Sequence, residues 1–378
     1  MRLAAAAVLS LLLLPASAAA VDHYVAFGDS ITEGVGDDPA RPEKGYPPRL
    51  EVLLTQAGVE AQVDNQGKGG EKTPEGLERI DSVLVPGGIL LLMEGSNDIS
   101  REISVEATRF NLREMARRAE SSAMTVVHAT VIPRTPQAKV DADNKTTARL
   151  DQNIRDLAFG RGRKLADNFE VFWEIPDRFN THYLIEADDF VGHPNAQGYD
   201  VMARTFFETL RDIDHVPPVT GIIDPPDGDR GVPVFTPLSV DVLDFGSGVD
   251  RAATSLLVNG APVAATLTGE GRLVHLDYAP TQAWSGVVHV TLRSRDTATP
   301  ANSVDREIAA FYPAGITFLG GDVDRDGRVD GNDLVLFGRA FGAHLGGPRY
   351  VVTADTNTDG SIDGVDLAVL ASNFGRSI

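Results

Sequence analysis

Short apolar runs alternate with amphipathic helical patterns from His23 to about Asp212 of this 378-residue chain. The run Ile89-Leu90-Leu91-Leu92-Met93 is continuous, as is typical of a strand that is buried on both faces. Such strands, separated by helices, predict a parallel sheet with helices on both sides. Active sites collect at the carboxyl ends of the strands in sheets of this kind. The alternation therefore predicts an α/β fold and the edge at which its chemistry is found.

The expected elements of this α/β part follow from the same patterns. The predicted strands are His23–Phe27, Ala61–Asn65, Ile89–Glu94, Met124–Ala129 and a weaker one at Lys164–Asp167. The predicted helices are Pro48–Gln56, Val105–Ser122, Thr147–Phe159 and Ala196–Leu210.

A second part follows a proline-rich joint, Pro217-Pro218 and then Pro225-Pro226. Helical periodicity disappears from about Gly221 to Tyr312, and short β-rich runs are divided by Gly, Pro, Asn and Asp turns. This pattern predicts an all-β sandwich. The predicted strands are Leu238–Val242, Thr254–Val258, Leu273–Leu276 and Val287–Leu292. The motif Asp244-Phe245-Gly246-Ser247-Gly248-Val249-Asp250, with Val258-Asn259-Gly260, resembles bacterial Ig-like repeats, which act more often as spacers than as binding modules.

An acidic loop occurs twice near the C-terminus, and the two copies are offset by 33 residues. Oxygen side chains or a carbonyl stand at loop positions 1, 3, 5, 7, 9 and 12, and glycine, Gly327 or Gly360, stands at position 6, where the chain turns sharply. This spacing predicts two structural Ca²⁺ sites. Their predicted ligands are Asp322, Asp324, Asp326, Arg328 (through its backbone carbonyl), Asp330 and Asp333 in the first loop, and Asp355, Asn357, Asp359, Ser361, Asp363 and Asp366 in the second.

The segment that holds these loops, about 59 residues from Gly320 to Ile378, resembles a type I dockerin. Position 12 is Asp rather than Glu and no helix precedes either loop, so the segment differs from a helix–loop–helix calcium sensor. The resemblance implies a small all-α module that binds a cohesin-type scaffold protein. The selector positions hold Gly331-Asn332 and Gly364-Val365, which match no specificity pair that we can assign. A calcium-stabilised module without a cohesin partner is the alternative.

The first 20 residues have the pattern of a signal peptide. Arg2 precedes the uncharged run Leu3–Leu14, and Ala18-Ala19-Ala20 offers a small-x-small cleavage site. An uncleaved membrane anchor is the alternative, but the run is short for a hydrocarbon core of ~30 Å. No later apolar run approaches 18 residues, so we expect an exported, soluble protein, extracellular or on the cell surface, without a transmembrane segment.

Composition excludes several classes of function. Asp plus Glu number 54 against 34 Lys plus Arg, and the net charge of −20 disfavours binding to nucleic acid or to an anionic membrane. The chain has no cysteine, which removes disulfides, thiol nucleophiles and Cys-ligated metals.

A serine and a histidine stand in distinctive contexts. Ser30 lies in Gly28-Asp29-Ser30, directly after the first predicted strand, and a serine nucleophile needs a base and oxyanion donors. His193 lies in Gly192-His193-Pro194-Asn195, on the loop ahead of the last helix. Gly67–Gly70 follows the second strand, and Gly95-Ser96-Asn97-Asp98 follows the third.

These four blocks, in this order, resemble the SGNH or GDSL hydrolase family over residues 21–212. The resemblance implies a flavodoxin-like αβα sandwich and serine-dependent ester hydrolysis that needs no metal. Ser30 is then the nucleophile and His193 the general base. The oxyanion hole consists of the Ser30 and Gly70 backbone N–H groups and the Asn97 amide. No Gly-x-Ser-x-Gly motif occurs, which argues against an α/β-hydrolase.

The acid of the triad departs from the family pattern. The family usually has Asp three residues before the histidine, where this chain has Phe190. We expect Asp189, four residues before His193, to orient the imidazole. Asp188 and a backbone carbonyl are the alternatives, because orientation and tautomer matter more than proton transfer to the acid.

The patterns together predict an exported serine esterase that deacetylates polysaccharide. A lipase or lysophospholipase that acts on lipid-like acyl esters is the alternative, and a non-catalytic surface binding protein is the alternative of another class. The expected division is a signal peptide (1–20), hydrolase domain (21–213), linker (214–220), Ig-like β-sandwich (221–313), linker (314–319) and dockerin-like module (320–378).

Overall fold

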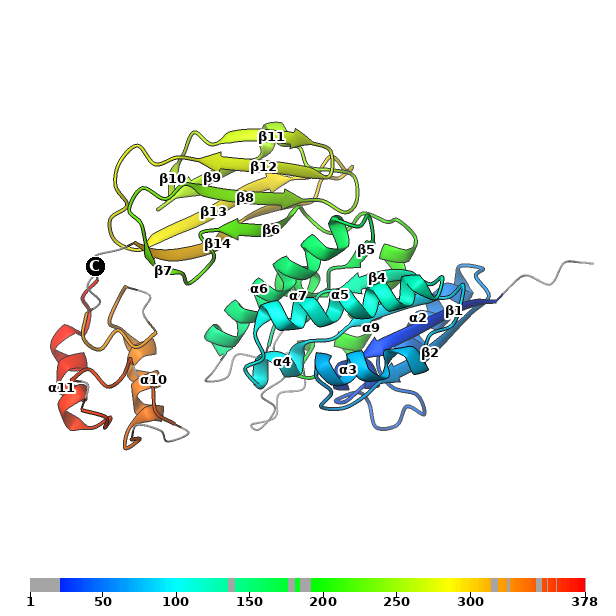
Figure 1. The fold of residues 1–378 in the computed structure, drawn as a ribbon, viewed down its shortest axis with the longest axis horizontal. Helices are drawn as coiled ribbons and strands as arrows, with labels where there is room; N and C mark the ends of the chain where they lie inside the picture. Colours follow the sequence, from blue (N-terminus) through cyan, green and yellow to red (C-terminus); the bar gives the residue numbers. More distant parts are fainter. Residues whose placement is uncertain are drawn as a thin grey trace, which may run out of the picture.

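The structure is a computed structural model that describes residues 21–134, 140–175, 181–183, 192–313, 319–324, 327–344, 349–351, 353–357 and 359–377. An α/β part, a β-sandwich and a pair of short helices follow one another along the chain (Figure 1). The signal-peptide prediction for residues 1–20 lies outside the described residues.

The α/β part is built on a five-stranded sheet in which every pair of neighbours is parallel, as predicted. The strand order β2-β1-β3-β4-β5 is that of flavodoxin-like folds. The chain leaves β1 in one direction to form β2 and returns on its other side to form β3, so the carboxyl end of β1 lies at the switch point where such sheets bind ligands. The strands are β1 (Asp22–Gly28), β2 (Ala61–Gly67), β3 (Ile89–Met93), β4 (Thr125–Ala129) and β5 (Lys164–Ala166).

Helices cover both faces of this sheet, and the alternation of side chains along β1 shows how. Tyr24 and Ala26 belong to one apolar cluster, whereas Val25 and Phe27 belong to the other. Helices α2 and α9 pack in the first cluster, where Tyr46 and Phe206 stack with ring centroids 4.5 Å apart. Helices α5 and α6 pack in the second. The helices are α1 (Ser30–Glu33), α2 (Tyr46–Gln56), α3 (Thr73–Arg79), η1 (Ile80–Ser82), α4 (Ser96–Ser100), α5 (Val105–Ser121), α6 (Val140–Phe159), α7 (Asn168–Glu174) and α9 (Ala196–Leu210).

Two sheets form the β-sandwich, in the strand orders β11-β12-β8-β6 and β10-β9-β13-β14-β7. One apolar cluster joins them, with Val240 and Leu276 from the first sheet and Val290 and Phe311 from the second. The strands are β6 (Val219–Asp224), β7 (Arg230–Val232), β8 (Leu238–Leu243), β9 (Ser255–Val258), β10 (Ala261–Pro262), β11 (Thr266–Glu270), β12 (Leu273–Tyr278), β13 (Val288–Arg295) and β14 (Ser303–Pro313), with the short helix η2 at Arg251–Ala253. Strand β6 begins inside the segment 214–220 that was expected to be a linker.

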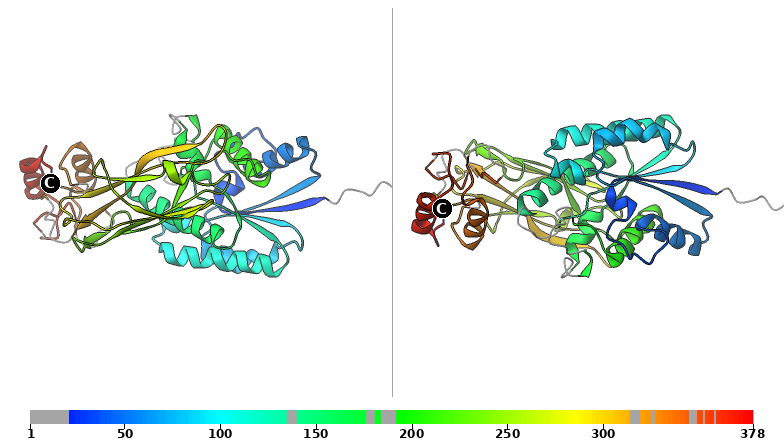
Figure 2. Two further views of the ribbon diagram at one scale, coloured as in Figure 1. Left: turned by 90° about the horizontal axis from the view of Figure 1, so that it is seen from above. Right: turned by 90° about the horizontal axis from the view of Figure 1, so that it is seen from below.

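The β-sandwich contacts the α/β part through side-chain hydrogen bonds, and the two lie side by side in Figures 1 and 2. Arg306 on β14 donates two hydrogen bonds of 2.6 Å to the two carboxylate oxygens of Glu170 on α7. Arg155 on α6 donates to the Thr220 carbonyl at 3.2 Å. These bonds cross between the two parts, so the β-sandwich packs against the α/β part and forms an interface with it.

The C-terminal part consists of two copies of one loop–helix unit. Helices α10 (Gly331–Ala340) and α11 (Gly364–Asn373) each follow an acidic loop. The Val329 N–H donates to the Arg376 carbonyl and the Ile362 N–H to the Ala343 carbonyl, both at 2.9 Å, so each loop pairs with the chain beyond the other helix. Phe337 and Leu370, equivalent in the repeat, share one core.

Within the part of the chain that the structure describes, no helix is both long and apolar enough to cross a bilayer.

Candidate active site

Ser30 is the first residue of helix α1, which follows strand β1, an inner strand of the sheet between β2 and β3. The Asp29 side chain caps this helix, because its Oδ1 accepts the Ile31 N–H at 2.9 Å. Gly28 allows β1 and β3 to approach closely here, since a Cβ on it would lie 2.1 Å from the Met93 carbonyl oxygen. Ser30 is thereby held at the carboxyl edge of the sheet.

His193 meets Ser30 although 163 residues separate them: the distance from its Nε2 to the Ser30 Oγ is 2.9 Å. The loop that carries His193 is fixed by its neighbours. Asn195 caps α9 by accepting the Gly198 N–H at 3.1 Å, and its Nδ2 donates to the Thr181 carbonyl at 2.9 Å. A Cβ on Gly198 would lie 2.3 Å from the His182 carbonyl oxygen, so glycine is required where these segments touch.

The loops after β2 and β3 flank the loop after β1. Gly70 lies on the first of them with a positive φ of 73°. Asn97 lies on the second, in α4, and its Nδ2 donates to the carbonyl of Glu71, the residue after Gly70, at 2.8 Å. An amide nitrogen carries two N–H groups, and this bond occupies one of them. The structure thus joins the two loops on which sequence analysis placed oxyanion donors.

Buried polar bonds brace these loops. Glu71 is buried and accepts from the Arg79 guanidinium, whose Nε lies 2.8 Å from its Oε1. Asp98 accepts from the Thr73 N–H at 2.9 Å and the Thr108 hydroxyl at 2.7 Å, which fixes α4 against α3 and α5.

Arg134 also supports α4 and was not identified from the sequence. It lies beyond β4, is almost fully buried, and donates to the Ser100 hydroxyl at 3.0 Å and to the Ser96 carbonyl. No periodic pattern in the sequence marks an arginine that turns inward beneath α4.

Buried carboxyls give the site its electrostatic character. Burial raises the pKa of Asp29 to about 6. Burial raises the pKa of Glu94 well above its usual range, and the charges of Asp29, Glu71 and Asp98 raise it further. Neither Glu94 oxygen has a hydrogen-bond partner among the described residues, in keeping with a pKa that burial raises. The sequence carried one signal for it: an acid that directly continues an apolar strand.

The sequence candidates for the third member of a triad belong to the segment before Gly192. Asp188, Asp189 and Phe190 lie outside the described residues.

The acidic loops offer an oxygen-only donor set, which suits Ca²⁺. Carboxylate oxygens of Asp322, Asp324 and Asp333 all lie within 4.8 Å of one another. Gly327 and Gly360 have φ of +88° and +86°, as the sharp turn at position 6 requires. Of the predicted ligands, only Asp326 lies outside the described residues; the others lie on the loops at Arg328, Asp330, Asp355, Asn357, Asp359, Ser361, Asp363 and Asp366.

Two stretches of the chain match known families. Residues 26–201 match the GDSL-like lipase/acylhydrolase family, and residues 320–374 match the dockerin type I domain. Dockerin type I domains bind calcium, in agreement with the donor set of the loops. No curated protein matches the chain.

Solved structures resemble about half of the chain. One is a member of the lipolytic protein G-D-S-L family from Veillonella parvula, with 21% sequence identity and a TM-score of 0.41, covering 50% of this chain and 97% of that chain. Another is Axe2, an acetylxylan esterase from Geobacillus stearothermophilus, with 19% identity and a TM-score of 0.42, covering 50% of this chain and 94% of that chain.

Proposed function

We propose that this chain, a carboxylic ester hydrolase whose residues 26–201 belong to the GDSL-like lipase/acylhydrolase family, is an exported enzyme that removes acetyl groups from polysaccharide. The contact between the Ser30 hydroxyl and the His193 imidazole, 2.9 Å long, carries the proposal. A hydroxyl paired with a base at the carboxyl edge of a parallel sheet is the arrangement that nucleophilic acyl transfer needs.

The proposed reaction has two steps. His193 accepts the Ser30 proton as Oγ attacks the ester carbonyl, and the alcohol leaves with a proton from His193. Water then attacks the acyl-enzyme with His193 again as the base, and Ser30 regains its proton when the acid leaves. A carboxylate or carbonyl that orients the imidazole completes the arrangement, and Asp189 is our candidate for it.

The developing oxyanion is proposed to bind the Ser30 N–H, the Gly70 N–H and the Asn97 amide. The bond from Asn97 to the Glu71 carbonyl supports this role, because it fixes the amide next to the Gly70 loop before substrate arrives. Fixed donors cost no reorganisation during the reaction, and this is the main source of their catalytic effect.

The proposed substrate follows from the other segments of the chain, the dockerin domain and the N-terminal signal-peptide pattern. Dockerin domains bind cohesins, which gather enzymes on a scaffold or cell surface, and the N-terminal residues have a signal-peptide pattern. Attachment of this kind keeps an enzyme close to a solid substrate outside the cell, and polysaccharide is such a substrate.

The C-terminal module is the proposed attachment site for a cohesin-type partner. Large apolar side chains are exposed at equivalent positions of its two repeats: Leu334 and Leu367 are 45% and 36% exposed, and Phe341 and Phe374 are 46% and 51% exposed. Exposed apolar pairs of this kind favour a protein partner over solvent. Binding of immobilised cohesins in calcium, and its loss in EDTA, is the direct test.

The catalytic proposal is tested by hydrolysis of p-nitrophenyl esters from acetate to palmitate and of acetylated xylan. Ser30→Ala is the inactive variant. The matched control is Ser121→Ala, which replaces an exposed serine on α5 whose hydroxyl donates to the Arg117 carbonyl. We expect activity confined to short acyl groups and absent only in Ser30→Ala. Activity that peaks at long chains would replace polysaccharide by lipid-like esters. Wild-type activity no higher than that of Ser30→Ala on every substrate would favour a non-catalytic binding protein.

A further inference from the structure

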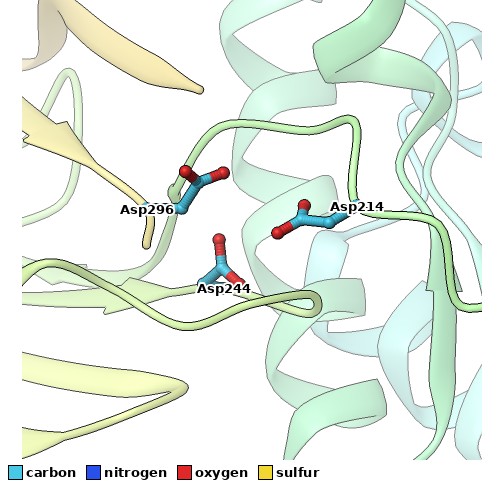
Figure 3. Close-up of side chains that lie close together, drawn as sticks. All are labelled: Asp214, Asp244 and Asp296. Atoms are coloured by element: carbon cyan, nitrogen blue, oxygen red, sulfur yellow. The ribbon is translucent and has the colours of Figure 1, made fainter. Parts of the chain in front are cut away.

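Three carboxylates gather where the β-sandwich meets the connection from α9, outside both the candidate active site and the acidic loops (Figure 3). Asp214 comes from the segment between α9 and β6, Asp244 follows β8, and Asp296 follows β13. One oxygen from each lies within 4.8 Å of the others. The cluster therefore combines both sheets of the sandwich with the connection to the hydrolase.

The surroundings bring these charges together without neutralising them. Asp244 and Asp296 are each only 1% exposed. None of the three forms an ion pair with Lys, Arg or His within the described ranges. The carboxylates instead accept backbone N–H groups: Asp214 accepts from Ser247 at 2.7 Å, and Asp296 from Asn302 at 2.8 Å. Burial, with the charges of Asp214 and Asp296, raises the pKa of Asp244 to about 6.

Asp244 supplies an independent sign that a ligand belongs here. Its Oδ1 accepts the Gly246 and Gly248 N–H groups at 2.9 and 2.7 Å, but its Oδ2 is buried with no hydrogen-bond partner among the described residues. Figure 3 shows this carboxylate directed into the space between the other two. A buried carboxylate oxygen that faces two more carboxylates is strongly destabilising unless a cation or a proton compensates its charge.

The donors select the class of cation. Carboxylate oxygens without imidazole or thiolate disfavour zinc and copper and suit calcium or magnesium. Opposite oxygens around Ca²⁺ lie about 4.6–5.2 Å apart and around Mg²⁺ about 4.0–4.2 Å apart. The three carboxylate oxygens lie within 4.8 Å of one another, a limit that either ion satisfies. Mg²⁺ usually keeps several waters and takes only one or two carboxylates, so three protein carboxylates favour Ca²⁺.

We propose that Asp214, Asp244 and Asp296 bind one Ca²⁺ that joins the β-sandwich to the hydrolase. Carbonyl groups and water complete its coordination, as they do at most calcium sites. The Asp214 carboxylate can lie beside Gly246 only because glycine has no side chain: a Cβ at this position would lie 2.2 Å from the Asp214 carboxyl carbon. The site is independent of the two dockerin loops and of the proposed substrate.

The experiment counts calcium on the full-length chain by equilibrium dialysis with radioactive Ca²⁺ at up to 1 mM free ion. Asp244→Asn should bind one ion fewer than the wild type, whatever number the dockerin loops hold. The amide oxygen can still accept the Gly246 and Gly248 N–H groups, so the turn keeps its bonds. Asp305→Asn, on the same sandwich but in an exposed pair with Arg293, is the matched control and should bind as many ions as the wild type.

Hydrogen exchange locates the ion. Calcium should slow amide exchange at least tenfold in residues 211–218, 244–250 and 296–302 of the wild type and not in Asp244→Asn. Asp214→Asn, at a less buried position, decides the matter if Asp244→Asn fails to fold, as judged by circular dichroism. Equal calcium counts for the wild type and a folded variant, or exchange in these segments that ignores calcium, would overturn the proposal and leave a proton shared between the carboxyls as the explanation.

Discussion

Replacing Arg306 by Ala tests whether the β-sandwich and the hydrolase unfold as one unit. Its guanidinium makes two 2.6 Å bonds to Glu170, whose side chain is fully buried. Removing one partner of a buried pair costs about 3–5 kcal/mol, because the other charge stays buried. Arg306 is 21% exposed and Arg155 still lies 3.4 Å from Glu170, so we expect a smaller loss of about 2–3 kcal/mol.

The chain offers an unusually direct assay, because it has two tryptophans, Trp173 on α7 and Trp284 in the sandwich. Urea unfolding followed by fluorescence in Trp284→Phe reports the hydrolase, and in Trp173→Phe it reports the sandwich. The two transitions should coincide with Arg306 present and separate in Arg306→Ala.

A double-mutant cycle with Glu170→Gln isolates the interaction energy between Arg306 and Glu170, because neutral Gln removes the negative charge that pairs with Arg306. The double variant should recover at least about 1 kcal/mol relative to the sum of the single losses. Arg293→Ala, in an exposed pair with Asp305, is the control and should cost less than about 0.5 kcal/mol. If Arg306→Ala cost no more than Arg293→Ala, the docking of the two parts would not depend on this pair and the reasoning would fail.

Three further predictions concern the site and the loops. Asn97→Ala should lower kcat by ~10²–10³ with little change in KM, measured on p-nitrophenyl acetate; an unchanged kcat would remove Asn97 from the oxyanion hole. EDTA should abolish the helical circular dichroism of residues 320–378, whose clustered carboxylates repel one another without calcium, and should leave the ester hydrolysis intact; a spectrum indifferent to EDTA would contradict this. Asp29 has a pKa of about 6 in the folded protein against about 3.9 in the unfolded chain, so its ionisation destabilises the fold as pH rises from 4 through 6. Asp29→Asn should therefore match the wild type in stability at pH 4 and exceed it by up to about 3 kcal/mol at pH 8. Urea midpoints that differ equally at both pH values would show that ionisation of Asp29 is not the cause.

The parallel sheet could be predicted because its strands are buried on both faces and bounded by loops. The predicted strand at Ile89–Glu94 ends one residue earlier, at Met93, and the helix predicted at Thr147–Phe159 begins at Val140. The early part of that helix, which includes Asn144, Lys145 and Thr146, has no apolar periodicity from which a start could be read.

Several sandwich strands could not be predicted, for a different reason. Strand β14 contains Asp305, Arg306 and Glu307 in a row, which is not an alternating pattern. The partner of Arg306 is a carboxylate on another part of the chain, and only the docked structure supplies it. Strand β6 lies between two proline pairs and shifts register between Thr220 and Ile223, so its sequence is typical of a joint.

The sites likewise contain some residues that the sequence predicted and others that it could not. The order of four short motifs anticipated the meeting of Ser30 and His193, since chain order and strand ends together imply proximity. Glu94 had no predicted role, because its meaning depends on burial. The carboxylates of Asp214, Asp244 and Asp296 are too widely spaced for any local motif, and only the packing of two sheets and a connection brings them together.

The connection between α9 and β6, which is held by hydrogen bonds, affects how the enzyme would move when its C-terminal module is bound. A flexible tether lets an enzyme sweep a volume, and the effective concentration at any point falls as the tether lengthens. Here the ion pair of Arg306 with Glu170 and the hydrogen bond from the Ser247 N–H to Asp214 both cross between the β-sandwich and the rest of the chain and oppose rotation of one part against the other. If a cohesin holds the C-terminal module, the hydrolase and the β-sandwich would therefore move together, and the carboxyl edge of the parallel sheet would keep its orientation relative to the sandwich.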